Sequence, residues 1–184
     1  MTQKGRATVT DAPRFQLSPR QALLRIELWG EIAAVSARFE AAFGIGLPAA
    51  SRSVSTGDLR VIWREPKAWM IAAPMVGSQD LLAKLSDISD QAGAVTDISG
   101  AAVRCTLHGP DWRVLLTHGG VFDAEDPAFA PGCVAGTVVE HINIRIDVVS
   151  DNQADVYVAP SYAVDLLGYW ETVAGSLAVK ITVR

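Results

Sequence analysis

Two stretches of this chain follow the same plan, and this internal repeat constrains the possible folds more than any other feature of the sequence. Residues 69–99 and 156–184 each contain an apolar run that ends in Ala-Pro, then Asp-Leu-Leu, then Ala-Gly, and then a second apolar run. The two copies lie about 85 residues apart. Because each copy must bury its apolar faces against the other, the repeat predicts a duplicated architecture, but it says nothing about chemistry.

Length and composition favour one domain with a large core. The chain has 184 residues, of which 49% are hydrophobic, and this is ample for a stable core. Residues 1–20 are polar and show no period, so we interpret them as a tail. We expect residues 21–184 to form a single domain made of two pseudo-repeats, at about 21–99 and 100–184.

The distribution of charge and of apolar residues excludes several partners. The formal net charge is −4 although the tail is basic, so the folded body is acidic and a poor partner for nucleic acid. No apolar run approaches the length of a membrane-spanning helix. The two cysteines show no disulfide framework. We therefore expect a soluble cytoplasmic protein that does not bind membranes.

Hydrophobic periodicity predicts two similar units along the chain. The first is a β-α-β-β-α-β unit, with expected elements at 24–28 (strand), 32–43 (helix ending at Gly44), 59–63 and 68–73 (hairpin strands), 78–88 (helix capped by Ser78) and 94–98 (strand). The second has one extra strand, with expected elements at 103–107 (strand), a short helix opened by Pro110 and Asp111, 134–139, 142–148 and 155–159 (strands), 162–173 (helix) and 177–183 (strand). Strict alternation in several of these strands indicates sheets with one polar face, so the predicted class is α+β with mostly antiparallel pairing.

No catalytic or metal-binding motif is found. Cys105 and His108 are three residues apart on a predicted strand, so they point to opposite faces and cannot chelate one ion together. His118-Gly119-Gly120 is similar to an oxyanion loop, but the chain has no G-x-S-x-G motif to supply a nucleophile. We predict no catalytic residue, no metal site and no cofactor in this chain.

Aromatic and polar side chains provide the candidate binding residues. Most of the aromatic residues have the spacing of core positions, and some are expected to anchor a partner chain; these interface candidates are Trp63, Trp69, Trp112 and Tyr162. Two polar rows follow predicted strands, and they comprise Arg104, Thr106 and His108 on one and Asn143, Arg145 and Asp147 on another. We interpret these rows as the solvated face of a sheet, with a ligand-binding or protein-binding surface as the alternative.

Several short segments, in this order and spacing, resemble one known family. They are residues 63–74, Asp97-x-Ser99, Gly109-Pro110, Pro127-x-Phe129-x-Pro131-Gly132 and residues 157–162. Together they are similar to the gamma subunit family of heterotetrameric sarcosine oxidase, and through it to the folate-binding domain of the glycine-cleavage T-protein superfamily. The resemblance runs from about Leu24 to Trp170. It suggests that the two copies interlock and exchange strands.

The resemblance also implies a function and a set of partners. In that enzyme the alpha, beta and delta subunits hold FAD, FMN, NAD and zinc, and tetrahydrofolate accepts the one-carbon unit when sarcosine is oxidatively demethylated to glycine. The gamma subunit is implied to be a non-catalytic structural subunit, so the chain is expected to belong to an oxidoreductase without an active site of its own. The resemblance leaves open whether the substrate is sarcosine, dimethylglycine or N-methylglutamate.

One departure from the folate-active proteins bears on cofactor binding. Those proteins carry Gly-Gly and paired aspartates at the hairpin where this chain reads residues 140–147, and only Asp147 remains here. Arg145 and Asp147 are therefore the only candidates for a folate pocket. We expect the chain alone not to transfer one-carbon units. The alternative is a stand-alone tetrahydrofolate-binding module of the T-protein superfamily.

Overall fold

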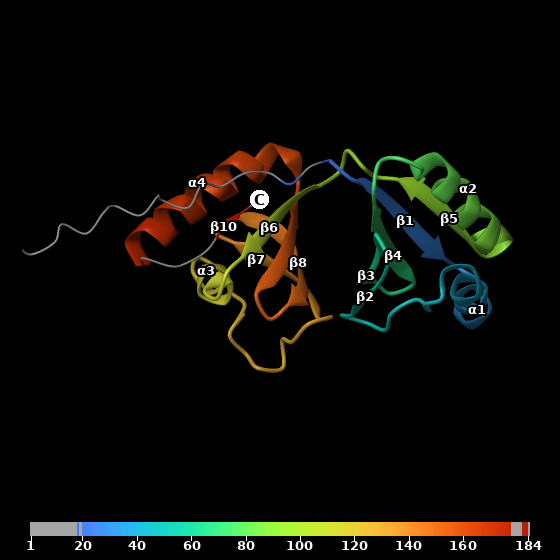
Figure 1. The fold of residues 1–184 in the computed structure, drawn as a ribbon, viewed down its shortest axis with the longest axis horizontal. Coiled ribbons are helices and arrows are strands. Elements are labelled where there is room, and N and C mark those ends of the chain that lie inside the picture. The colour runs from blue at the N-terminus through green and yellow to red at the C-terminus, as the bar shows by residue number, and fades with distance from the viewer. Residues whose placement is uncertain (1–17, 19, 178–181, 184) are drawn as a thin grey trace, which may run out of the picture.

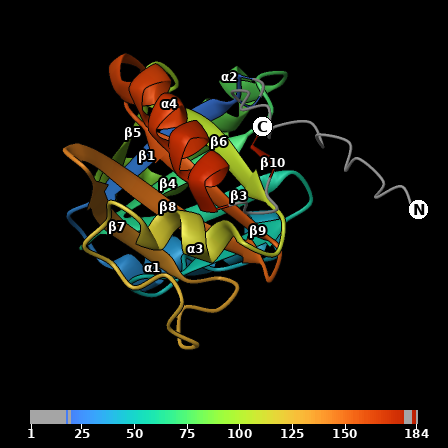
Figure 2. The same ribbon diagram turned by 90° about the vertical axis from the view of Figure 1, so that its left-hand side faces the viewer.

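A computed structural model describes residues 18, 20–177, 182 and 183. Two five-stranded sheets lie between helices that cover their outer faces, so the described chain forms helix, sheet, sheet and helix layers (Figures 1 and 2). All strand pairs recorded in these sheets are antiparallel. The predicted α+β class with antiparallel sheets is confirmed.

The first half of the chain builds one sheet and its two helices. Its elements are β1 (Ala22–Leu28), α1 (Ile32–Phe43), β2 (Ser53–Thr56), β3 (Leu59–Glu65), β4 (Ala68–Ala73), α2 (Ser78–Ser89), the 3₁₀ turn η1 (Asp90–Ala92) and β5 (Gly93–Asp97). The strand order across the sheet is β2-β3-β4-β1-β5. Gly44 ends α1 in the left-handed region, with φ of 75°, and its N–H donates to the Glu40 carbonyl, as the sequence predicts.

The second half repeats this arrangement. Its elements are β6 (Val103–His108), α3 (Trp112–Thr117), β7 (Val134–Val139), β8 (Ile142–Ser150), β9 (Gln153–Val158), α4 (Pro160–Leu177) and β10 (Thr182–Val183). Read from the other edge, the strand order is β7-β8-β9-β6-β10, which matches the first sheet position for position. Each half is therefore a β-α-β-β-β-α-β unit. The expectation of an extra strand in the second half is wrong, since β2 in the first half is its equivalent.

The strand register makes individual residues of the two halves equivalent. Ile62 pairs with Ser53 and Met70, and Asp147 pairs with Val134 and Asp155 at the same places in the second sheet. The same register makes Arg60 equivalent to Arg145, which lies two residues before Asp147 on β8. The β3–β4 and β8–β9 hairpins even share a register shift near the turn. These equivalences allow the two halves to be compared side chain by side chain.

Each half has its own core between its sheet and its helices. In the first half, Val35 and Phe39 of α1 and Leu85 of α2 pack on Leu24 and Ile26 of β1. In the second half the buried side chains of α3 and α4 pack on the sheet, and they include Trp112, Leu115, Leu166 and Trp170. The helices are thus fixed to the outer faces, and the inner faces of the two sheets are free to meet each other.

Three finer expectations are wrong. Each sheet takes its strands from one half only, so among the described residues no strand is exchanged between the copies. Ser78 is the first helical residue of α2 rather than its cap, because Gly77 occupies the cap position and no side chain caps the helix. Leu177 is the last residue of α4 instead of the start of a strand. Residues 178–181 of that predicted strand lie outside the described residues.

Candidate functional site

The inner faces of the two sheets meet in a mixed layer of apolar and charged side chains. Leu23, Ile62 and Met70 of the first sheet and Val134 and Tyr157 of the second form one buried cluster. In the polar row of β8, Asp147 is buried in this layer and Arg145 is half-buried, whereas Asn143 is exposed. The interpretation of the row as a solvated sheet face is therefore corrected for Arg145 and Asp147.

Asp147 lies at the centre of this layer and is 0% exposed. Its Oδ1 accepts hydrogen bonds from Ser53 Oγ and from Arg60 Nη2, both at 2.6 Å, and its Oδ2 accepts one from Arg60 Nε. Arg60 Nη2 also donates to Ser53 Oγ and to the Val148 carbonyl. Burial alone would lower the pKa of Arg60, but the hydrogen bonds and charge of Asp147 hold it above its usual value.

A short backbone bridge joins the two halves next to this ion pair. Arg52 and Cys133, the residues just before β2 and β7, form an isolated antiparallel bridge. The Ser53 N–H donates to the Gly132 carbonyl, and the Val134 N–H donates to the Ser51 carbonyl. Because Arg52 and Cys133 hold equivalent places in the two halves, the approximate two-fold axis of the molecule passes through this bridge.

A second carboxylate on the same face is less completely neutralised. Asp155 is 3% exposed, accepts a 2.8 Å hydrogen bond from Thr106 Oγ1, and lies 3.6 Å from Arg104 Nη1. Burial raises the pKa of Asp155, and the nearby Arg104 only partly offsets that effect. Arg104 Nε is buried and has no hydrogen-bond partner in the described part of the chain.

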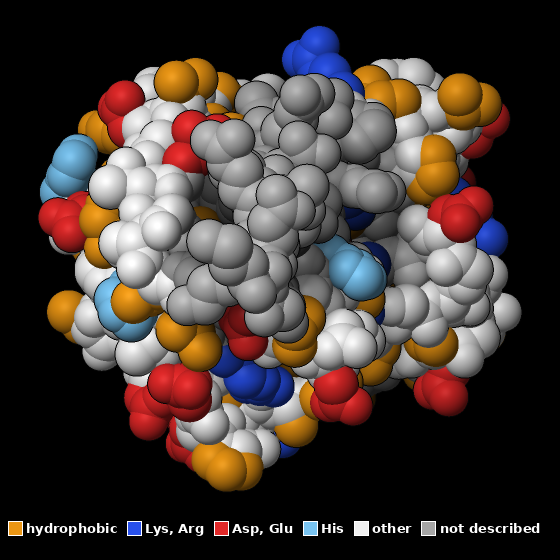
Figure 3. All heavy atoms as spheres, turned by 60° about the vertical axis from the view of Figure 1, so that its left-hand side comes forward, with side chains coloured by type: hydrophobic (Ala, Val, Ile, Leu, Met, Phe, Trp, Pro, Cys, Tyr) orange, Lys and Arg blue, Asp and Glu red, His pale blue; other side chains and the backbone are white. Residues whose placement is uncertain are grey.

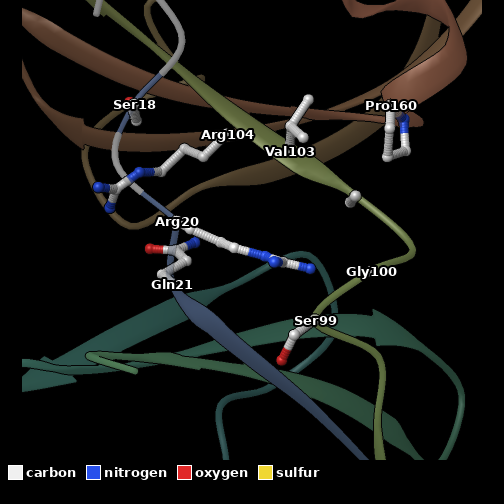
Figure 4. Close-up of a pocket in the computed structure, with 9 residues that line it drawn as sticks. Ser18, Arg20, Gln21, Ser99, Gly100, Val103, Arg104 and Pro160 are labelled. Carbon is white, nitrogen blue, oxygen red and sulfur yellow. The ribbon is translucent and has the colours of Figure 1, made fainter. Parts of the chain in front are cut away.

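The chain segments that enter β1 and β6 enclose a cavity of about 460 Å³. Its lining includes Arg20, Gln21, Ser99, Arg104 and Pro160. In Figure 4, Arg20 extends toward the segment with Ser99 and Gly100, whereas Arg104 points toward Ser18. Ser99 is held in place by Asp97, whose carboxylate accepts from both its N–H and its hydroxyl and whose pKa is lowered by these bonds.

The other folate-pocket candidate, Arg145, lies beside a smaller cavity of about 230 Å³. This cavity is lined by Arg64 and Asn143 as well as Arg145, and its apolar wall includes Met70 and Tyr157. The structure therefore separates the two candidates. Asp147 is enclosed by Arg60 and Ser53, whereas Arg145 reaches an open cavity.

Two of the four interface candidates are core residues. Trp112 is 0% exposed and donates from Nε1 to the Asp151 carbonyl, and Trp69 is 5% exposed and donates to the Pro48 carbonyl. Their burial inside the chain removes them as direct contacts for a partner. Trp63 is half-buried against the first core, and Tyr162 is 45% exposed at the start of α4.

Sequence reasoning missed several residues that the structure makes important. Arg60 and Ser53 were not identified from the sequence. The repeat is the signal that could have found them, because it predicts that the first half has a strand equivalent to β7. Trp29 is 61% exposed and directly follows β1, on the side of the alternation that carries Arg25 and Glu27, and the sequence shows this alternation. On the face in Figure 3, outside the residues drawn in grey, hydrophobic side chains lie in small groups between charged ones.

Two further features of the described residues bear on the kind of site that they can form. No group of three His, Cys, Asp or Glu side chains there could hold a metal ion. No helix in that part of the chain is long and apolar enough to span a bilayer. Cys105 is 0% exposed, and burial raises the pKa of its thiol to about 12, so it behaves as a small core residue.

Comparison with known proteins agrees with this architecture. A chain of the heterotetrameric sarcosine oxidase from Corynebacterium sp. U-96, in complex with pyrrole 2-carboxylate, superimposes with a TM-score of 0.77 and 18% identity, covering 90% of this chain and 85% of that one. The glycine cleavage system aminomethyltransferase T from Bartonella henselae gives a TM-score of 0.58 and 16% identity, covering 88% of this chain and 45% of that one. A search of curated protein sequences finds no match.

These likenesses define a class: the protein has the α+β fold of folate-binding, T-protein-like domains. A family model narrows this further, since the model described as "Sarcosine oxidase, gamma subunit family" matches residues 30–176. The chain belongs to the sarcosine oxidase gamma subunit family.

Proposed function

We propose that this chain is the gamma subunit of a heterotetrameric, cytoplasmic sarcosine oxidase and has no active site of its own. The observation that carries the proposal is the family match over residues 30–176. Its partners are the alpha, beta and delta subunits, which hold FAD, FMN, NAD, zinc and tetrahydrofolate. The assembly oxidatively demethylates sarcosine to glycine, and the gamma subunit docks on the folate-binding part of the flavoprotein alpha subunit.

The state of Asp147 supports a structural role. A folate-active site needs a carboxylate that can reach the ligand, but both oxygens of Asp147 accept hydrogen bonds inside the chain and the side chain is 0% exposed. Asp147 and the residues that enclose it therefore do not fit tetrahydrofolate. Isothermal titration of the isolated chain with tetrahydrofolate should give no binding, and a micromolar Kd would instead support the stand-alone folate module.

Exposed aromatic side chains are the proposed contacts with the partner subunits, because such residues dominate the energetics of interfaces. Tyr162 and Trp29 are the strongest candidates, and Trp63 is a weaker one because it is partly buried against the first core. The tail at residues 1–20, also expected to contact a partner, lies outside the described residues apart from Ser18 and Arg20.

Co-expression with the alpha, beta and delta subunits, followed by gel filtration, tests the proposal. The chain should elute with them, and Tyr162→Ser should weaken this co-elution. Val121→Ser is a matched control, since Val121 is 88% exposed but is not aromatic. Elution of the unmodified chain only as a separate monomer would contradict the proposed function.

A further inference from the structure

Arg60 and Arg145 occupy equivalent positions in the two sheets but have opposite surroundings. Arg60 donates to Asp147, to Ser53 and, from Nη1, to Ser55. The register shows which residues stand at the equivalent places around Arg145. They are Ile62 for Asp147, Val134 for Ser53 and Gly136 for Ser55. None of these three has a side chain that can accept a hydrogen bond.

Arg145 therefore has no partner for its charge among the residues that the structure describes. Among the described residues, its guanidinium forms no hydrogen bond and no ion pair. Burial and the neighbouring charge of Arg64 lower the pKa of Arg145. The carboxylate of Glu65 acts in the opposite direction, but Glu65 is already bound to Arg25 at 2.8 Å. Two half-buried guanidinium groups thus share one small region with no carboxylate committed to them.

The same region is hollow and has the lining of an anion site. The cavity of about 230 Å³ includes Arg64, Arg145 and Asn143, and none of its described lining residues is acidic. This is notable in a chain whose formal net charge is −4. Gly136, directly opposite Arg145 on β7, has no side chain, and a Cβ atom there would lie 3.9 Å from Arg145 Nη2. At that distance a Cβ would make ordinary van der Waals contact, and the glycine offers the guanidinium no side-chain acceptor.

We infer that Arg64, Arg145 and Asn143 form a carboxylate-binding site at the junction of the two sheets. A planar guanidinium matches a carboxylate through two parallel hydrogen bonds, and the second arginine and the amide complete the donors. The small apolar wall admits a short carboxylic acid or a single acidic side chain. The carboxylate comes either from a small acid in solution or from a partner subunit, and in the second case the inference rests on the proposed function.

Isothermal titration of the full chain with succinate tests the site. A titration with sodium chloride that adds the same amount of charge is the reference. The unmodified chain should bind, and Arg145→Gln and Arg64→Gln should each weaken binding by about tenfold or more, because each removes charge-assisted hydrogen bonds. Arg38→Gln is the matched control, since Arg38 is exposed on α1 and donates to the Ile88 carbonyl. Urea unfolding of each variant checks that it is folded.

Repeating the titration with the purified assembly separates the two sources. Retained succinate binding identifies a small acid as the ligand, and lost binding identifies a partner carboxylate that has filled the site. The inference is overturned if the unmodified chain gives no heat at millimolar succinate, or if Arg145→Gln and Arg64→Gln bind as well as the Arg38→Gln control. Because the first titration needs no partner, its failure is distinct from a failure of assembly.

Discussion

Arg60 in the first half and Arg145 in the second have the same place in the fold, yet within the described part of the chain only Arg60 is neutralised. Arg60 crosses to Asp147 of the other half, whereas Ile62 stands where the reciprocal carboxylate would be. A symmetric pair of halves would have two such ion pairs or none. The difference shows that one arginine of the repeat joins the halves, while its counterpart remains available for a ligand.

Replacing Asp147 with the residue of the first half should have the largest effect. Asp147→Ile leaves the Arg60 guanidinium, which is 17% exposed, without its carboxylate, and we expect a loss of about 3–5 kcal/mol in the free energy of unfolding. Urea unfolding measures the loss. The double variant Arg60→Leu/Asp147→Ile should recover most of it, because no charge is then buried alone. If the double variant is as unstable as the single one, packing and not charge explains the loss.

Cys105 is the second-half equivalent of Leu24, and its thiol should be inert in the folded chain. Its pKa is raised to about 12 by burial, so the thiolate fraction at pH 8 is about a thousandfold below that of an ordinary cysteine. Alkylation with iodoacetamide, followed by mass spectrometry, should label Cys105 only after unfolding in urea. Equal labelling rates with and without urea would contradict the buried position.

Gly136→Ser should make the surroundings of Arg145 more like those of Arg60. The new hydroxyl stands where Ser55 stands in the first half and offers Arg145 an acceptor. We expect succinate to bind a few-fold more weakly, since the hydroxyl competes for the guanidinium. Gly136→Ala is the control, because it adds the Cβ without an acceptor. Equal affinities for the two variants would count against direct contact of the ligand with Arg145.

The smallest expected effect concerns two aspartates with opposite pKa shifts. Burial raises the pKa of Asp155, so its contribution to stability is present at acid pH and is lost as the pH rises through the raised pKa. Hydrogen bonds from Ser99 lower the pKa of Asp97, so its contribution is present at neutral pH and is lost as the pH falls through the lowered pKa.

Urea unfolding between pH 3 and pH 7 can separate these contributions with two amide variants. Relative to the unmodified chain, Asp155→Asn should gain stability as the pH rises, and Asp97→Asn should lose it. If the relative stability of both variants changed in the same direction as the pH rises, the environments of Asp155 and Asp97 would not differ as described.

The local sequence pattern predicts most of the helices and strands, but it does not predict which parts of the chain pack against them. β4 and β7 have the predicted bounds because their alternation or continuous apolar character is strong. β2 was missed because it is only four residues long and contains Ser53, Ser55 and Thr56, which are equally typical of a loop. The alternation in β8 shows a polar face, but the partner of Asp147 lies 87 residues away in the sequence. Trp112 was misjudged for the same reason, since its burial depends on the docking of α3.

The ion pair between Arg60 and Asp147, which joins the halves, also determines which surfaces can associate. By the strand equivalences, two copies of the first half placed face to face would set each Arg60 against an Ile62. Each guanidinium would then be buried without a carboxylate, at a cost of several kcal/mol. The first half therefore pairs with the second half more favourably than with a copy of itself. In this duplicated fold, one aspartate is enough to favour pairing within one chain over self-association through this face.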